Sequence, residues 1–239
     1  MNAAPLLAVD GLSKAFQGLV ANRDIGFTVH HGEIVGLIGP NGAGKTTLFN
    51  CLAGFHQPTA GHIAFEGRDI TGTTPERAAA LGIARTFQIV RVFHSMTALE
   101  NVMVGAMLRN KGVAHARSRA LEELEFVGLG HRAEALASEM TVSEQKRLEV
   151  ARALATDPKL ILLDEVMAGL NQTEVREASQ LVVRIQERGI ASIIVEHVME
   201  GIMPIADRIL VLDYGAKIAD GTPEQIAEDP AVIAAYLGE

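Results

Sequence analysis

The chain has 239 residues, and its 48% hydrophobic content is sufficient for one large domain or two small lobes with a sizeable core. A net charge of −8 at pH 7 argues against nucleic-acid binding through a broad basic face, so no nucleic acid is expected as a partner. Neither an apolar run of roughly 18 residues nor a signal peptide is recognisable, which indicates a cytoplasmic chain without its own membrane anchor.

Short alternating apolar segments with intervening glycines dominate the beginning of the chain. They occur at residues 6–16, 26–29 and 62–66, and this period of two is typical of antiparallel strands. Within a single domain that covers the whole chain, we therefore predict an antiparallel β subdomain built from residues 1–32 and 60–73.

A glycine-rich loop separates the apolar run 34–38 from an expected helix. Its residues 39–46 fit the pattern G-x-x-x-x-G-K-[ST] in the context that the pattern requires, a buried strand before and a helix after. Backbone N–H groups of such a loop surround phosphate oxygens, which points to a nucleoside triphosphate as the ligand. A flexible turn leading into a helix is the simpler alternative. Cys51, the only cysteine, falls in the expected helix and is predicted to be buried.

The residues of this loop have distinct expected roles. Gly42 and Gly44 permit positive φ and close approach of the backbone to phosphate. Lys45 should reach the β and γ phosphates, the Thr46 hydroxyl should bind Mg²⁺, and Thr47 is placed to touch the α phosphate. The loop residues predicted to bind ATP are Gly39, Asn41, Gly42, Ala43, Gly44, Lys45, Thr46 and Thr47.

The middle of the chain is predicted to be mainly helical. A helix is expected to start at Thr74 and end at Gly82, and a strand over 83–87 then leads into Gln88. No strand pattern occurs between residues 95 and 156, where apolar residues recur at helical spacing. We therefore predict a separate helical subdomain over approximately 95–156.

Two continuous apolar segments follow, and they indicate buried parallel strands. Residues 159–164 end in Asp164, and residues 191–195 lead to His197. Asn171 begins the helix expected between these two strands. The last elements are expected as strands at 208–213 and 216–219 and as short helices from Pro223 and Pro230.

The carboxyl ends of parallel strands meet at one edge of a sheet, where α/β proteins bind ligands. At this edge Asp164 is the expected Mg²⁺ partner, Glu165 the general base or water-positioning group, and His197 a donor to the γ phosphate. Gln88 could hold the metal or the water. Each residue alone could equally be a polar residue at a strand end. The predicted catalytic residues are Glu165, His197, Gln88 and Lys45, and the predicted Mg²⁺ ligands are Thr46, Gln88 and Asp164.

Over essentially its whole length, the chain resembles the nucleotide-binding subunits of ABC transporters. The motifs that carry the resemblance are Walker A at 39–46, the Q-loop glutamine Gln88, Walker B at 160–164 with Glu165 after it, the D-loop at 168–171 and the switch histidine His197. It implies an α/β P-loop NTPase core with a mostly parallel sheet, an antiparallel β subdomain and a helical signature subdomain. It also implies an ATPase coupled to transport, with ATP and Mg²⁺ as cofactors.

Two positions carry further expectations from this resemblance. Phe16 occupies the place of the aromatic residue that stacks on adenine, although a core residue at a strand end is the alternative. Val166 replaces the proline that usually follows the catalytic glutamate.

The signature motif, normally L-S-G-G-Q, departs from the family pattern and reads M-T-V-S-E at 140–144. In the family this helix start faces ATP bound to the opposite subunit, so Thr141, Ser143 and Glu144 are expected to contact the partner's nucleotide. The resemblance therefore implies two cassettes arranged head to tail, with an identical or a paralogous chain as the second ATPase subunit. Transmembrane permease subunits are the other implied partners, which would hold the chain at the inner face of the cell membrane.

Within the family, the stretches at 84–88, 99–102 and 235–239 look most like the LivG type, which energises uptake of branched-chain and related hydrophobic amino acids. Urea importers and the lipopolysaccharide-export ATPase are alternatives within transporters. Outside them, the alternatives are a soluble ABC ATPase acting on nucleic acid or ribosomes and an unrelated P-loop kinase.

The segment 89–96, directly after Gln88, has too many apolar residues for a purely solvated loop and no clean period. One interpretation is that Val92, Phe93 and Met96 cover the core of the helical subdomain. The other is that the segment forms a groove for a short permease helix, so that movement of Gln88 is transmitted to the permease.

Overall fold

A six-stranded sheet forms the centre of the computed structural model, which describes residues 4–109 and 112–237. The strand order is β10-β9-β3-β8-β7-β6, and all neighbouring pairs are parallel except β9 with β10. The strands are β3 (Ile34–Ile38), β6 (Ile83–Arg85), β7 (Leu160–Asp164), β8 (Ala191–Val195), β9 (Arg208–Asp213) and β10 (Ala216–Gly221). Every residue of β3, β7 and β8 is buried, as their uninterrupted runs of mainly apolar residues predict.

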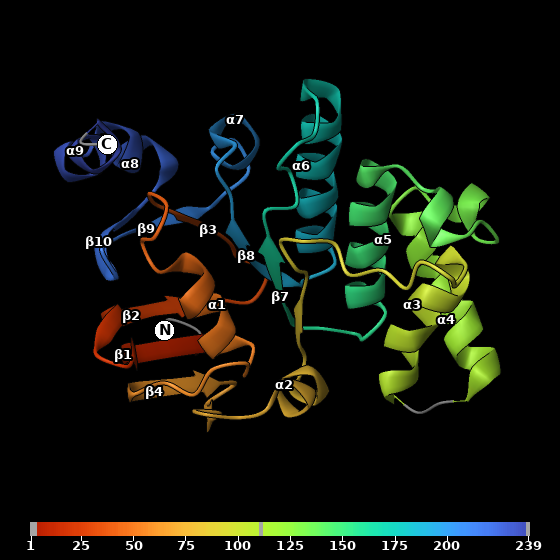
Figure 1. Cartoon of the computed structure of the whole chain (residues 1–239), viewed down its shortest axis with the longest axis horizontal. Helices are drawn as coiled ribbons and strands as arrows, with labels where there is room; N and C mark the ends of the chain where they lie inside the picture. Colours follow the sequence, from red (N-terminus) through yellow and green to blue (C-terminus); the bar gives the residue numbers. More distant parts are fainter. Residues whose placement is uncertain (1–3, 110–111, 238–239) are drawn as a thin grey trace.

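A second, antiparallel sheet has the strand order β2-β1-β4-β5 and lies beside α1 (Figure 1). Its strands are β1 (Leu7–Phe16), β2 (Leu19–Val29), β4 (Ala60–Phe65) and β5 (Arg68–Asp69). β2 begins earlier than the sequence pattern indicates, because its first half shows no apolar alternation. Leu19, Val20 and Ala21 are apolar but not buried, and this half pairs with β1 through register shifts. A tight β1–β2 hairpin therefore replaces two separated strands.

Helices cover the sheets. They are α1 (Lys45–Leu52), α2 (Pro75–Leu81), α6 (Gln172–Glu187), α7 (Met199–Ile202), α8 (Pro223–Glu228) and α9 (Pro230–Leu237). Of these, α2, α6 and α8 begin at side-chain caps. Thr74 caps α2, and Asn171 forms a capping box with Glu174 at the start of α6. In Figure 1, α6 stands between the central sheet and the remaining helices, while α8 and α9 lie at the opposite end.

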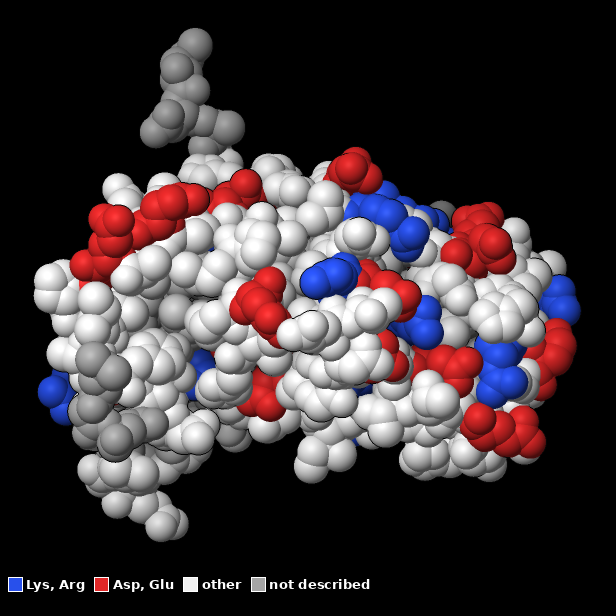
Figure 2. Space-filling view, turned by 90° about the horizontal axis from the view of Figure 1, so that it is seen from above, with Lys and Arg blue, Asp and Glu red and all other residues white. Residues whose placement is uncertain are grey.

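The remaining helices form a lobe at one end of the molecule (Figure 1). They are α3 (Ala98–Ala106), α4 (Val113–Phe126) and α5 (Val142–Leu154), with 3-10 turns η1 (Met107–Arg109), η2 (Gly130–Arg132) and η3 (Ala137–Glu139). In Figure 2, Lys and Arg side chains are concentrated over this end and are interleaved with Asp and Glu. Within the lobe, Arg119 pairs with the buried Glu123 and Arg132 pairs with Glu144. On this face the charges of the lobe are therefore mixed.

The central sheet separates two hydrophobic cores. Ile34 and Ile38 of β3 face the core that continues into the helical lobe, whereas Val35 and Leu37 face the core shared with α1 and the antiparallel sheet. Cys51 belongs to this second core, and burial raises the pKa of its thiol to about 11. No helix within the described ranges is both long and apolar enough to cross a membrane.

Candidate active site

The loop between β3 and α1 is shaped by glycines with positive φ. Gly39, Gly42 and Gly44 have φ values of 146°, 79° and 99°. Gly44 is the N-cap of α1, and a Cβ there would lie only 2.4 Å from the carbonyl oxygen of Ala21. Because no side chain caps α1, the first N–H groups of this helix are left to bind an anion.

Lys45 holds its ammonium within this loop. Its Nζ donates to the carbonyl oxygens of Gly39 at 2.6 Å and Pro40 at 2.9 Å, and only 6% of the residue is exposed. The loop opens into a pocket of about 370 Å³. The pocket is lined by Leu19, Val20, Ala21, Asn41, Gly42, Ala43, Gly44, Lys45, Thr46, Thr47, Gln88, Glu165, His197, Tyr214 and Gly215.

Three predicted site residues from different strand ends meet at this pocket. Gln88 follows β6, Glu165 follows β7 and His197 follows β8. One carboxylate oxygen of Glu165 accepts a hydrogen bond from Gln88 Nε2 at 3.0 Å, and the other lies 3.4 Å from His197 Nε2. The carboxylate of Glu165 is therefore directed to the pocket by two neighbours, next to the loop that holds Lys45.

Asp164, the last residue of β7, is buried and pairs with a cation that the sequence patterns did not reveal. Arg85 donates to its Oδ2 at 2.9 Å and to Asn50 Oδ1. Burial raises the pKa of Asp164, while Arg85 opposes that shift. An arginine at the buried end of an apolar strand needs an acidic or polar partner. The position of Arg85 at such a strand end is the only sequence signal that could have identified it.

The side chains around Asp164 fit a magnesium ion. The Oδ1 atom of Asp164 is buried and has no hydrogen-bond partner among the described residues, so it can accept a bond from a metal-bound water. Thr46 adds a hydroxyl in the phosphate-loop pocket, whose lining residues do not include Asp164 itself. Hydroxyl and carboxylate oxygens with nearby phosphates are the ligands that Mg²⁺ usually takes.

Comparison with known proteins identifies the family. The family model described as ABC transporter matches residues 22–168. The chain belongs to the ABC transporter family. A second model, described as branched-chain amino acid ATP-binding cassette transporter, matches residues 216–239. The expected α/β cassette and the prediction of an ATP-hydrolysing transporter subunit are thereby confirmed.

Relatives of this cassette are similar over nearly their full length. The high-affinity branched-chain amino acid transport ATP-binding protein LivG of Salmonella typhimurium is 42% identical, with 98% of each chain covered. The lipopolysaccharide export system ATP-binding protein LptB of Haemophilus influenzae is 34% identical, again with 98% of each covered. The crystal structure of the ADP conformation of the cassette MJ1267 superposes with a TM-score of 0.90 at 30% identity, covering 99% of this chain and 100% of that one.

The signature segment of the cassette lies outside the pocket that its own phosphate loop forms. Thr141, Ser143 and Glu144 do not line that pocket. Thr141 and Glu144 form a capping box at the start of α5, and Arg132 lies 3.3 Å from the Glu144 carboxylate. Ser143 is only 9% exposed and faces a cleft between α5 and α6.

Phe16, the residue predicted to stack on adenine, lies at the end of β1 and is 37% exposed. Its ring contacts His56 edge to face, with centroids 5.2 Å apart, and it does not line the pocket. Leu19, Val20 and Tyr214 line the pocket instead, and they are 72%, 42% and 89% exposed. These three apolar side chains were missed, although two exposed apolar residues at a hairpin turn are a recognisable signal.

The segment after Gln88 borders a groove of about 480 Å³ between the core and the helical lobe. Val92 is buried in the core of the lobe, but Phe93 is 45% exposed and lines the groove together with Phe87 and Arg91. The backbone of Phe93 exchanges two hydrogen bonds with the buried Asn101 side chain, at 2.8 and 3.1 Å. The interpretation that all apolar residues of this segment cover the core thus holds for Val92 and not for Phe93.

Proposed function

We propose that this cassette hydrolyses ATP to power a membrane importer of branched-chain or related hydrophobic amino acids. The match of residues 216–239 to the branched-chain cassette model supports this substrate class, as does the higher identity to LivG than to LptB. Both relatives are transporter subunits, so a soluble ABC ATPase acting on nucleic acid or ribosomes is the weaker alternative. A urea importer is a further alternative within transporters.

The observation that carries the proposed chemistry is the position of the Glu165 carboxylate, which faces the phosphate-loop pocket between Gln88 and His197. Glu165 would accept a proton from the attacking water or orient it, and His197 would donate to the γ phosphate. Lys45 would hold the β and γ phosphates. Thr46, Asp164 and Gln88 would hold Mg²⁺, which when bound would neutralise charge on the phosphate oxygens.

We further propose that each pocket is completed by a second cassette, identical or paralogous. The start of α5 supports this, because its signature residues do not line the pocket of their own chain. A head-to-tail pair about a twofold axis would bring Thr141 and the N–H groups near Ser143 to the partner's nucleotide.

The groove beside Phe93 is the proposed docking surface for the permease. Apolar side chains and the rings of Phe55, Phe87 and Phe93 line it and suit the apolar face of a short helix. Arg91 also lines it and can bind carbonyl oxygens where that helix ends. The cassette would thus sit at the inner face of the membrane through its permease subunits.

Replacement of Glu165 by Gln tests the chemistry and the pairing together. ATP binding should stay near the normal value while hydrolysis falls by about 10²-fold or more. In sedimentation, ATP with Mg²⁺ should shift this variant, alone or mixed with its paralogue, from monomer toward dimer. Normal turnover by the variant would remove Glu165 from the proposed role, and full turnover by a strictly monomeric species would contradict the paired site.

The groove is tested with Phe93→Asp. Because the side chain is half exposed, the melting temperature and basal ATPase of the isolated subunit should change little. Stimulated ATPase and transport in the assembled complex should be lost. Exposed Val113→Asp on α4, away from the groove lining, is the matched control. A large loss of thermal stability in Phe93→Asp would place the side chain in the core and contradict the docking surface.

The substrate is tested by transport with the permease that co-purifies with the chain. Vesicles containing the complex should accumulate labelled leucine or valine in an ATP-dependent manner. Accumulation of urea instead, or extraction of lipopolysaccharide, would overturn the proposed substrate class and leave the ATPase assignment intact.

A further inference from the structure

The segment that joins β7 to α6 is a buried loop, and its backbone needs partners that water cannot supply. Val166 is 9% exposed and Met167 is fully buried. Buried N–H and C=O groups outside helices and strands must find partners in other backbone groups or in side chains. Within the loop, the N–H of Glu165 donates to the carbonyl oxygen of Val195 at 2.9 Å, and the N–H of Ala168 donates to that of Glu165 at 3.3 Å. The loop also begins with Glu165 at φ 52°, a left-handed conformation that costs on the order of 1 kcal/mol or more for a residue other than glycine. The surroundings therefore have to hold this loop in place.

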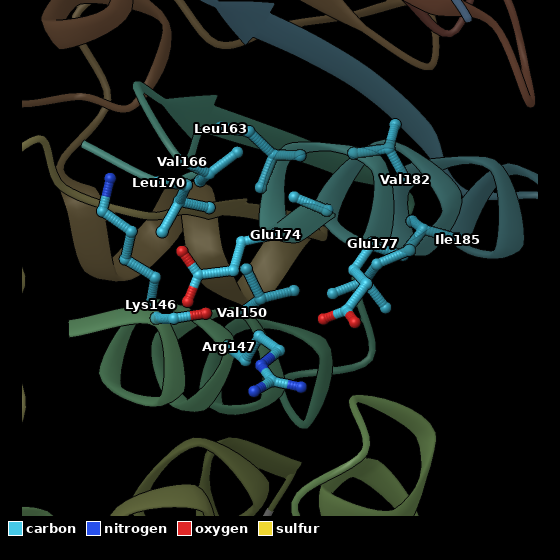
Figure 3. Close-up of a pocket in the computed structure, with 13 residues that line it drawn as sticks. Lys146, Arg147, Val150, Leu163, Val166, Leu170, Glu174, Glu177, Val182 and Ile185 are labelled. Atoms are coloured by element: carbon cyan, nitrogen blue, oxygen red, sulfur yellow. The ribbon is translucent and has the colours of Figure 1, made fainter. Parts of the chain in front are cut away.

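Lys146 binds the loop from the side of the signature helix α5. Its Nζ donates to the carbonyl oxygen of Glu165 at 2.8 Å and to that of Ala168 at 2.6 Å. Figure 3 shows the Lys146 side chain extending from α5 toward the segment that carries Val166 and Leu170. An ammonium group can serve two carbonyl oxygens in this way, and charge makes such bonds short and strong.

Glu196 binds the same loop from the end of β8. The residue is fully buried, and its Oε1 accepts the N–H of Met167 at 2.6 Å. Its Oε2 is 3.3 Å from the N–H of His197. Burial raises the pKa of Glu196 to about 7, while backbone N–H groups and Lys146 oppose that shift. Lys146 thus donates to two carbonyl oxygens of the loop, and Glu196 accepts from one of its amides.

We propose that Lys146 and Glu196 are positioning residues, which hold Glu165 at the angle needed for hydrolysis. The proposal rests on the proposed function of Glu165 as the base or water-positioning group. Lys146 acts on the carbonyl of Glu165 itself, and Glu196 acts on the peptide that leads to His197. Lys146 and Glu196 therefore fix the backbone of Glu165 and His197, whose side chains lie 3.4 Å apart at the pocket.

Precise placement of this carboxylate matters because a shift of about 1 Å can cost roughly 10²-fold in rate. The family usually has proline after this glutamate, and a proline ring restricts the backbone covalently. Val166 provides no such restriction. Lys146 and Glu196 each supply a non-covalent restriction, and Lys146 also attaches the catalytic loop to α5, the helix that begins with the signature residues.

The neighbouring Arg147 offers a matched control on the same helix. Both residues line the cleft between α5 and α6, but in Figure 3 the guanidinium of Arg147 points away from Val166 and Leu170. Among the described residues, no hydrogen bond joins Arg147 to the 165–168 loop. Replacing Arg147 by an uncharged residue should therefore alter the cleft while leaving the hydrogen bonds of Lys146 to the 165–168 loop intact.

The test measures steady-state ATP hydrolysis and ATP affinity separately in the full chain. For Lys146→Met we expect kcat to fall about tenfold or more, with the Kd for ATP within about twofold of the normal value. Lys146→Arg retains two donors and should recover most of the rate. Arg147→Met should stay close to the unmodified chain. Equal losses in Lys146→Met and Arg147→Met, or a normal kcat in Lys146→Met, would overturn the proposal.

A second arm separates positioning from general support of the fold. If Lys146 acts through Glu165, Lys146→Met should cause no further loss of hydrolysis in a Glu165→Gln background. A further tenfold loss there would show that Lys146 acts elsewhere and overturn the proposal.

Should Lys146→Met fail to fold because the Glu196 carboxylate is left uncompensated, Lys146→Met with Glu196→Gln removes both buried charges and is measured in its place. Normal hydrolysis by Glu165→Gln alone would instead refute the proposed function of Glu165.

Discussion

Two helix starts in this cassette are expected to meet phosphate, and they are built in opposite ways. α1 begins after Gly44, with no side-chain cap and with three positive-φ glycines that leave its N–H groups open. α5 begins after Thr141, whose hydroxyl accepts the N–H of Glu144 at 3.2 Å, while the Glu144 carboxylate accepts the N–H of Thr141 at 2.8 Å. The first helix start is open to an anion, and the second already satisfies part of its own backbone.

The difference indicates that the starts of α1 and α5 have different roles in phosphate binding. The open end of α1 can bind phosphate within a single chain. The capped end of α5 carries a carboxylate where the family has glutamine, and that charge repels phosphate. Burial acts to raise the pKa of Glu144, but the N–H of Thr141 and the nearby Arg132 outweigh it and keep this pKa below its usual value. Glu144 is therefore ionised at neutral pH, and Arg132 is the group that offsets its charge.

The difference between the two helix starts should be largest at Lys45, the first residue of α1. Lys45→Ala should weaken ATP binding to the isolated chain by about 10²-fold, the effect of removing one partner from a buried, charged hydrogen bond. Substitutions at the start of α5 should leave this single-chain affinity unchanged. Equilibrium titration with a fluorescent ATP analogue measures both, with Lys217→Ala on the surface as the control. Equal losses at Lys45 and Thr141 would mean that the signature segment contacts nucleotide within the same chain.

The two caps should also differ in what they tolerate. Gly44→Ala places a Cβ against the Ala21 carbonyl at a φ of 99°, so we expect a loss of roughly 2 kcal/mol or more in the free energy of unfolding. Thr141→Ala removes one cap bond and should cost about 1 kcal/mol. Urea denaturation measures both values. A Gly44→Ala chain as stable as Thr141→Ala would show that the loop can relax around the added methyl group.

Charge at the start of α5 can be removed without removing the cap. Glu144→Gln keeps a capping-box residue and eliminates the carboxylate. In the Glu165→Gln background, we expect the ATP-dependent dimer to become several-fold tighter, which corresponds to roughly 1 kcal/mol. Sedimentation at two salt concentrations measures this, because screening should reduce the benefit. An unchanged dimer affinity at low salt would mean that Arg132 already cancels the charge of Glu144.

The smallest expected effect is a pH dependence that only the α5 cap should show. The pKa of Glu144 is lowered in the folded chain, so its stabilising contribution is complete above the usual value near 4.5 and is lost as the pH falls through the folded value. Glu144→Gln should remove this contribution, and the stability difference between the two chains should narrow by a few tenths of a kcal/mol from pH 6 to pH 3. Urea midpoints across this range give the difference. If the stability difference between the two chains did not change with pH, the Glu144 carboxylate would have no role in acid stability.

The contrast between local and distant contacts also explains what could be predicted from the sequence. The phosphate loop is contiguous, so its residues, the strand before it and the helix after it follow from one pattern. Glu165 and His197 were recognisable because Glu165 directly follows an apolar strand and His197 lies two residues after the next one. The bonds of Lys146 to the loop after β7 join residues about twenty positions apart on different elements, and no spacing rule contains them.

Two features depend on contacts between distant residues. Leu19, Val20 and Ala21 at the start of β2 are apolar without being buried, so a period of two could not mark them, and their pairing with β1 makes this stretch a strand. Phe16 lies at the end of β1, and the direction of its ring depends on the contact with His56 from a separate segment. Side-chain direction at a strand end is a tertiary property.

Cys51 gives the cassette an internal reporter of how often the helix behind the phosphate loop opens. The thiol is 3% exposed, and burial keeps its pKa near 11, so thiolate is scarce at neutral pH. An alkylating reagent can react quickly only after α1 separates from the core, and it can modify no other residue as a thiol because the chain has one cysteine. The alkylation rate therefore measures local opening at this helix, and ATP should slow it in proportion to how tightly the closed form binds.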